Sequence, residues 1–403
     1  MPGFKLLLKE KWPLTVGAQL STPIVLLSML VTLLLLSLAG HYCSAHTYFK
    51  NFVRFNRAAT METLFPTTFA QVLNTVTEKG KGRKLVIIGG DSVFWGHGQK
   101  DDQVWSEELA RLLAPEFAVI NLSERGGCPF ELGYWVYEHL RRQGKEAILV
   151  TNCASVYPGA PTGNSIYNYF FSEARERDWL ETYKERDLWI KQFQNPYTSQ
   201  YLERTIWQKL DKYLYFRDLW TTVTYDLGST TLVFSASGKQ NYFLPRKYLP
   251  EEYDAVEMVL IDEQEARRWS GVQKARNDAA ITVNEGGQFK VNPWGYDHLV
   301  SNLEPTVVPH LRANIITVTI KPNPFVLSLM DEKDREASKL SDALVLRTYR
   351  QLGFNAVYLD SLERPDYIDL EHISPAGGRK LARFIAEKVK QHEKLPTAGK
   401  SPD

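Results

Sequence analysis

Apolar residues are arranged along this chain in two ways: one long unbroken run near the start, then short runs of alternating strand and helix character. From Pro13 to Gly40 no residue is charged. Because a helix of about 20 apolar residues spans a bilayer, we expect residues 13–40 to be a transmembrane anchor. The alternative is a cleaved signal peptide, whose apolar core is usually shorter, about 7–15 residues, and is followed by a clear cleavage site.

Basic residues flank this run on both sides. Lysines precede it at positions 5, 9 and 11, and basic residues follow it at positions 50, 54 and 57. Positive charge is favoured on the cytoplasmic side of a membrane, so the balance favours, by a small margin, a cytoplasmic segment at 1–12. The expected location is the cell membrane, crossed once, with the C-terminal domain periplasmic or extracellular.

After a predicted juxtamembrane stem at 41–82, the apolar period switches repeatedly between that of a strand and that of a helix. Short β-branched runs bounded by glycine or polar residues predict buried strands, and apolar residues on one helical face predict packed helices. Strands are expected at 84–90, 117–122 and 147–152, and helices at 101–115 and 131–144. Residues 83–159 therefore form the first part of a predicted α/β domain.

The alternation stops in residues 160–311 and returns in 312–393. The later segment holds predicted strands at 314–324 and 355–361 and predicted helices at 333–352 and 376–391. Alternating strands and helices indicate a parallel sheet with helices on both faces. We expect 160–311 to be a large, mostly helical insertion that caps the carboxyl edge of the sheet, and 394–403 to be a disordered tail.

Composition excludes few functions. The 48 basic and 47 acidic residues give a net charge of +1, so no overall field attracts nucleic acid. The three cysteines match no zinc spacing, and phosphate-loop, dinucleotide and HExxH motifs do not occur, so neither a cofactor nor a metal is expected. For Cys128 and Cys153, two free thiols are favoured over a disulfide.

The residues suited to chemistry lie in loops that follow predicted strands, where open parallel sheets bind their ligands. Ser92 follows the first strand, and Asp369 and His372 lie just before the last helix. A serine hydroxyl becomes a nucleophile when a base takes its proton, and histidine does this near neutral pH. A carboxylate orients the imidazole. Ser92, His372 and Asp369 are therefore the candidate catalytic residues.

An oxyanion that forms at the attacked carbonyl needs hydrogen-bond donors placed in advance. The backbone N–H groups of Ser92 and Gly126 and the side-chain amide of Asn152 are the candidates. Each motif also has a plainer interpretation, as a helix cap or an ordinary turn. His97 and His298 are rival bases, and the Gly-x-Ser-x-Gly elbow is absent because position 94 is Phe.

Four segments together resemble the conserved blocks of the SGNH (GDSL-like) hydrolase family. They are Gly90-Asp91-Ser92, Asn121 to Gly126, "VTN" ending at Asn152, and Asp369-x-x-His372. The resemblance covers residues 84–160 and 312–390, and it implies a flavodoxin-like sheet, a Ser-His-Asp triad, and an oxyanion hole from Ser92, Gly126 and Asn152. The third block departs from the family, since Thr151 and Cys153 flank Asn152 where Gly-x-Asn-Asp is usual.

The N-terminal span, the interrupted α/β domain and the stretches "ITVTIKPNPF", "GFNAVYLDS" and "DLEHISPAGGRKLA" carry a narrower resemblance. They are similar to membrane-anchored bacterial members of this superfamily, which include the teichoic-acid D-alanylation accessory protein and the alginate-acetylation proteins. This resemblance implies an extracytoplasmic serine esterase or O-acyltransferase that acts on acyl groups of a cell-surface glycopolymer, beside a membrane-bound O-acyltransferase. Two alternatives remain. One is a non-catalytic accessory subunit of such a system, and the other is a lipid esterase.

The predicted insertion contains tryptophans in a charged, helical context, at positions 179, 189, 207 and 220. Aromatic faces pack well on sugar rings, so we expect exposed members of this set to form a wall that binds the acceptor. Packing in the core is the expected role of most of them.

Overall fold

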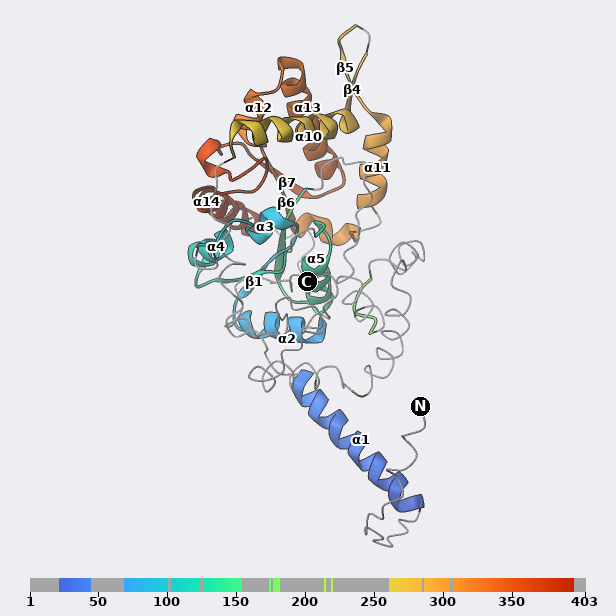
Figure 1. Cartoon of the computed structure of the whole chain (residues 1–403). Coiled ribbons are helices and arrows are strands. Elements are labelled where there is room, and N and C mark those ends of the chain that lie inside the picture. The colour runs from blue at the N-terminus through green and yellow to red at the C-terminus, as the bar shows by residue number, and fades with distance from the viewer. Residues whose placement is uncertain are drawn as a thin grey trace, which may run out of the picture.

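The computed structural model describes residues 22–44, 69–100, 103–123, 127–153, 174, 177–181, 214, 219, 261–284, 286–304 and 307–394. Within these ranges, five parallel strands form one sheet in the order β2-β1-β3-β6-β7. The strands are β1 (Lys84–Ile88), β2 (Phe117–Asn121), β3 (Ala147–Asn152), β6 (Ile315–Ile320) and β7 (Asn355–Leu359). The predicted flavodoxin-like α/β fold is confirmed (Figure 1).

Helices cover both faces of this sheet because its strands are apolar on both sides. In β1, Leu85 and Ile87 pack into one cluster, whereas Val86 and Ile88 pack into another on the opposite face. The first cluster includes α5 (Leu132–Arg142) and α13 (Glu332–Gln351), and the second includes α3 (Ser92–Trp95), α4 (Trp105–Leu113) and α14 (Pro375–Glu393). Near-continuous apolar runs are typical of such doubly covered parallel strands.

The segment between β3 and β6 leaves the sheet and returns beside the strand it left. Leu149 pairs with Ile315 and Asn152 with Val318, although residues 153–314 separate the two strands. The sheet therefore accommodates a long insertion at this point without a change in strand order.

Within the described end of the predicted insertion, α10 (Glu263–Ala280) lies against the loop that precedes α14. The antiparallel hairpin β4 (Ile281–Val283) and β5 (Phe289–Val291) and the helix α11 (Pro293–Leu303) follow it, and the 3-10 helix η5 (Pro309–Asn314) leads into the start of β6. Ile261 and Ala266 are buried against Val326 of α12 (Pro324–Ser328) and Leu370. α10 thus contacts the segment that carries Asp369 and His372.

Residues 69–79 belong to the globular domain, which corrects the prediction of a stem over 41–82. They form α2 (Phe69–Lys79), whose Phe69, Val72 and Val76 are buried in the first core cluster. Their i, i+3, i+7 spacing places them on one helical face. The polar and Gly/Lys-rich residues that follow concealed this stripe in the sequence.

An apolar helix, α1 (Thr22–Ser44), precedes the domain and lies within the predicted anchor and its first flanking residues. Its window Pro23–Tyr42 has a mean hydropathy of 2.4, and its leucines are exposed, as Leu30 is at 66%. In length and composition it matches a signal anchor or a signal sequence. In Figure 1 it lies beyond α2, away from α10 and α12.

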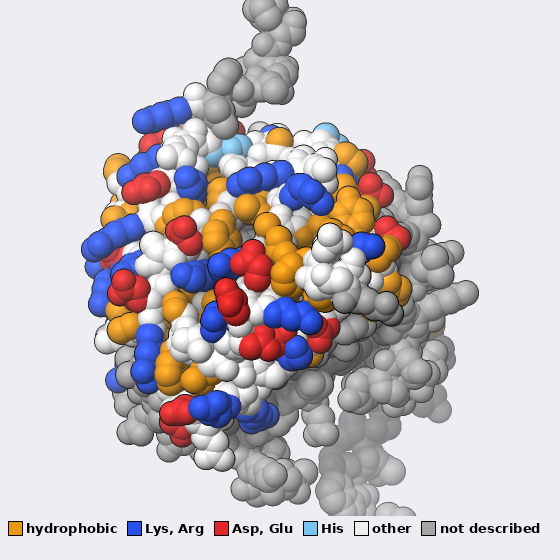
Figure 2. Space-filling view, turned by 90° about the horizontal axis from the view of Figure 1, so that it is seen from above, with side chains coloured by type: hydrophobic (Ala, Val, Ile, Leu, Met, Phe, Trp, Pro, Cys, Tyr) orange, Lys and Arg blue, Asp and Glu red, His pale blue; other side chains and the backbone are white. Residues whose placement is uncertain are grey.

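Charges of both signs are interspersed over α10, which lies across the top of Figure 1 and faces the viewer in Figure 2. Lys274 pairs with Asp334 of α13 at 2.5 Å, and Arg267 pairs with Glu263 at 2.5 Å. No single sign of charge dominates the face that Figure 2 shows.

Candidate active site

Ser92 lies at the carboxyl end of β1, as the first residue of the four-residue helix α3. Asp91 caps this helix, since its carboxylate accepts a 2.9 Å hydrogen bond from the N–H of Val93. The preceding turn requires glycine at position 90: its φ is +117°, and a Cβ there would lie 2.3 Å from Asn152 Oδ1. The turn therefore presents the Ser92 hydroxyl at the edge of the sheet next to β3.

His372 and Asp369 reach the same edge from the loop before α14. Ser92 Oγ lies 2.7 Å from His372 Nε2, and His372 Nδ1 lies 2.6 Å from Asp369 Oδ2. A carboxylate only accepts hydrogen bonds, so Nδ1 carries the proton and Nε2 presents its lone pair to the serine hydroxyl. The three residues, separated by up to 280 positions in sequence, form a continuous hydrogen-bonded chain.

A tight turn orients Asp369 within this chain. Its Oδ1 accepts the backbone N–H groups of Glu371 and His372 at 2.9 and 2.8 Å, which leaves Oδ2 for the imidazole. Burial alone would raise the pKa of Asp369, but the hydrogen bond from the His372 ring, the charge of that ring and the two backbone hydrogen bonds hold it below its usual value. The carboxylate is therefore ionised wherever His372 acts as a base.

The pKa of His372 is raised above its ordinary value. Burial alone would lower it, and the opposing effects come first from Asp369 and then from the charges of Glu371 and Asp91. The imidazolium that forms when His372 accepts a proton is thereby stabilised.

Asn152 lies beside the serine, but its amide is paired with Asp91. Its Nδ2 donates to Asp91 Oδ2 at 2.7 Å, and its Oδ1 accepts the N–H of Asp91 at 3.3 Å. Because Nδ2 has two hydrogens, one is not used by Asp91. Burial, followed by the charge of Glu371, raises the pKa of Asp91 to about 6. Gly126, the third predicted oxyanion donor, lies outside the described residues.

Of the two rival bases, His97 is close to the site. Its ring centroid lies 4.6 Å from that of His372, and its backbone N–H donates to the backbone carbonyl of Ser92 at 3.0 Å. The hydroxyl of Ser92 is nevertheless bonded to His372. The side chain of His298 lies outside the described residues.

Several supporting residues could not be found from the sequence pattern. The buried side chain of Gln99 donates to the carbonyl of Ile373 at 3.0 Å and accepts the N–H of Trp105 at 2.9 Å, so it links the segment after Ser92 to the one after His372. From α10, Arg276 pairs with Glu371 at 2.8 Å. Both contacts are long-range, and neither residue belongs to a recognisable motif.

Cys128 and Cys153 are free thiols, the favoured alternative of the sequence analysis. Burial raises the pKa of both thiols, that of Cys153 to about 11, so neither is an activated nucleophile. Within the described ranges, His, Cys, Asp and Glu do not gather in a group of three or more that could hold a metal ion.

Trp179 is the one member of the predicted aromatic wall whose structure is described. It is half-buried and packs near Phe69 of α2 and His139 of α5, with ring centroids 5.9 and 5.1 Å away. It therefore has a packing role. Tryptophans 189, 207 and 220 lie outside the described residues.

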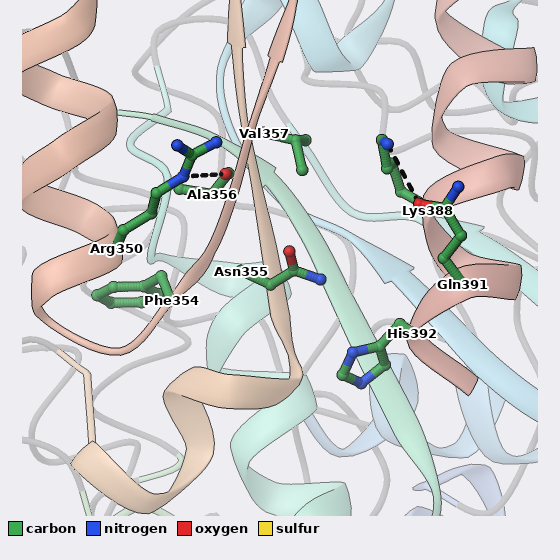
Figure 3. A pocket seen from close by; sticks show the side chains of 8 residues that line it. All are labelled: Arg350, Phe354, Asn355, Ala356, Val357, Lys388, Gln391 and His392. Carbon is green, nitrogen blue, oxygen red and sulfur yellow. Dashed lines mark hydrogen bonds between the residues drawn. The ribbon is translucent and has the colours of Figure 1, made fainter. Parts of the chain in front are cut away.

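A pocket of about 400 Å³ lies at the start of β7, at the opposite edge of the sheet from Ser92. Figure 3 shows Arg350 on one side of this strand and Lys388 and His392 on the other. Because it lies at the amino end of β7 and Ser92 lies at the carboxyl edge, the pocket is not a second part of the candidate active site.

Comparison of the chain with family models, curated proteins and solved structures finds no match. The geometry of Ser92, His372 and Asp369 is therefore the observation from which a function must be argued.

Proposed function

We propose that this chain is a membrane-anchored serine esterase or O-acyltransferase of the SGNH (GDSL-like) type, acting outside the cytoplasm on acyl groups of a cell-surface glycopolymer. The observation that carries the proposal is the chain of two short hydrogen bonds from Ser92 through His372 to Asp369. Such an arrangement activates a serine hydroxyl for attack on an ester carbonyl.

In the first step, Ser92 Oγ attacks the carbonyl carbon of the ester while its proton moves to His372 Nε2. The carbonyl electron pair moves onto oxygen, where the N–H of Ser92 and the second Nδ2–H of Asn152 are the described donors available to it. When the carbonyl re-forms, the ester C–O bond breaks, and His372 donates its proton to the leaving alcohol. The product is an acyl group on Ser92.

In the second step, the acyl group leaves by the same route in reverse. A water or a sugar hydroxyl gives its proton to His372 Nε2 and attacks the acyl carbon, and Ser92 Oγ leaves with the proton from the imidazolium. Water completes a hydrolysis, whereas a sugar hydroxyl completes a transfer. The two outcomes use the same residues and differ only in the nucleophile that reaches the acyl-enzyme.

The substrate class and location rest on α1 and on a resemblance in sequence. An apolar helix at the start of the chain is consistent with an anchor that holds the domain at the outer face of a membrane. The stretches at 316–325, 353–361 and 369–382, together with the span and the interrupted α/β domain, resemble anchored bacterial proteins that modify surface polysaccharides. A membrane-bound O-acyltransferase that delivers acyl groups outward is the proposed partner.

One contact favours a second candidate, a non-catalytic accessory subunit of such an acyltransferase system. The amide of Asn152 donates one of its hydrogens to Asp91, so it is less free to bind an oxyanion than a donor without such a partner. A lipid esterase is the third candidate, and it draws its support from the anchor.

The test uses the full-length protein in membranes and a fluorophosphonate probe, which phosphonylates activated serines. Wild type should be labelled at Ser92, and Ser92→Ala and His372→Ala should not be labelled. Ser328→Ala is the matched control, since this exposed serine at the end of α12 donates to the carbonyl of Phe325 and takes no part in the hydrogen-bonded chain from Ser92 to Asp369. Release or transfer of acetyl groups from a surface polysaccharide, compared with a phospholipid, then distinguishes the substrate classes. Full acyl turnover by folded Ser92→Ala would support the accessory role instead.

A further inference from the structure

Asn323 is a fully buried amide beside the loop that carries Asp369 and His372. It follows β6, and its exposed fraction is 0%. Its side-chain Nδ2 donates to the carbonyl of Asp369 at 2.8 Å, and its backbone N–H donates to the carbonyl of Leu370 at 3.0 Å. Two of its polar groups are therefore bonded to consecutive residues of the candidate catalytic loop.

Helix capping accounts for only part of this arrangement. Asn323 Oδ1 accepts the N–H of Phe325 at 3.0 Å and so caps α12. Asn292 precedes a proline in the same way and caps α11 through a 3.2 Å bond from the N–H of Trp294. In Asn292 the cap involves Oδ1 alone and the residue is half-buried. Capping of α12 does not require the hydrogen bond from Asn323 Nδ2 to the carbonyl of Asp369.

The contacts of Asn323 link the loop to a strand of the central sheet. Ser92 follows β1, which is separated from β6 by β3 alone. When the carbonyls of Asp369 and Leu370 are held at the end of β6, the turn that aims Asp369 Oδ2 at His372 is held relative to Ser92. A displacement of about 1 Å between reacting groups reduces an enzyme rate by about 100-fold.

We propose that Asn323 is a positioning residue for the acyl chemistry at Ser92, which it serves by fixing the turn of Asp369. The inference rests on the proposed function. Its amide touches neither the substrate nor the reacting atoms, and it acts through the orientation of Asp369 toward His372.

The primary variant is Asn323→Ser, which retains a side chain that caps helices well but is too short to reach the Asp369 carbonyl. Asn292→Ser is its matched control. The readout is the rate of fluorophosphonate labelling of Ser92 in the full-length protein, followed against probe concentration and pH, well below the melting temperature of each variant.

For Asn323→Ser we expect the maximal labelling rate to fall by about 10- to 100-fold, with the half-saturating probe concentration unchanged. The pH midpoint should move lower, because a misaligned Asp369 no longer offsets the lowering of the His372 pKa by burial. Asn292→Ser should retain both the wild-type rate and the wild-type midpoint. Asn323→Thr, which likewise keeps a capping hydroxyl, adds no charge and lacks the amide donor, should behave like Asn323→Ser and serves if the serine variant does not fold.

Two results would overturn the role of Asn323: wild-type labelling kinetics in a folded variant, or a lower rate with an unchanged pH midpoint, which would indicate a purely structural role. Absence of labelling in the wild-type protein would instead refute the proposed function, and the positioning role with it.

Discussion

The half-buried carboxyl of Asp342 should make the folded protein less stable as the pH rises. Asp342 lies on α13, and its Oδ2 accepts a 3.1 Å hydrogen bond from the hydroxyl of Tyr358 on β7. Burial raises its pKa from 3.8 to about 7, against the smaller, lowering effect of that hydrogen bond. The folded chain therefore holds a proton that the unfolded chain releases at a lower pH.

The sign and size of the effect follow from proton linkage. Between the unfolded and folded pKa values the folded state binds more protons, so raising the pH lowers the free energy of unfolding. For values of 3.8 and about 7, the loss between about pH 5 and about pH 8 is at most about 2.5 kcal/mol. For a folded domain of about 300 residues, that corresponds to a fall in melting temperature of about 4 °C.

The perturbation that removes this effect is Asp342→Asn, because an amide oxygen still accepts the Tyr358 hydrogen bond and does not ionise. Thermal unfolding of the full-length protein is followed by circular dichroism at several pH values. As the pH rises, the melting temperature of the variant should increase relative to that of wild type. The titration of Asp91, whose pKa is also raised by burial, occurs in both proteins and cancels in the comparison. Asp360→Asn, at an exposed position just after β7, is the control and should follow wild type. Parallel curves for wild type and Asp342→Asn would refute the reasoning.

Three further outcomes are expected. Asp369→Asn should slow labelling of Ser92 by up to about 10⁴-fold. The pH midpoint of labelling should also fall, because burial lowers the pKa of His372 and Asp369 is the main opposing influence. An unchanged midpoint would remove Asp369 from the triad. Gly133→Ala should destabilise the domain by about 1–3 kcal/mol, because a Cβ there would lie 2.6 Å from Gly89 Cα, where α5 crosses the end of β1. The control Gly271→Ala, which adds a Cβ in open space on α10, should not lower the melting temperature. A reporter fused after Lys394 should be active outside the cytoplasm, and activity confined to the cytosol would reverse the proposed orientation.

The order of strands and helices was predictable because it depends on local periodicity. Runs such as the one at 84–90 are short, β-branched and apolar on both sides, which suits a strand covered on both faces. Since the carboxyl ends of parallel strands meet at one edge, the positions of Ser92 and His372 in the chain also predicted that they would converge. Helix α2 was missed, because a single amphipathic stripe beside a polar segment does not reveal whether a core receives it.

The sequence by itself determined which residues could take part in acyl chemistry, since that depends on residue type and on placement after a strand. Only the tertiary structure decided how they pair. It bonds Ser92 to His372 although His97 lies beside the same ring, and it joins Asn152 to Asp91. It also places Asn323 against Asp369 and Arg276 against Glu371. These pairings depend on distances between segments far apart in the chain, which are set by how the helices and loops pack on the sheet and by the need of buried polar groups for partners.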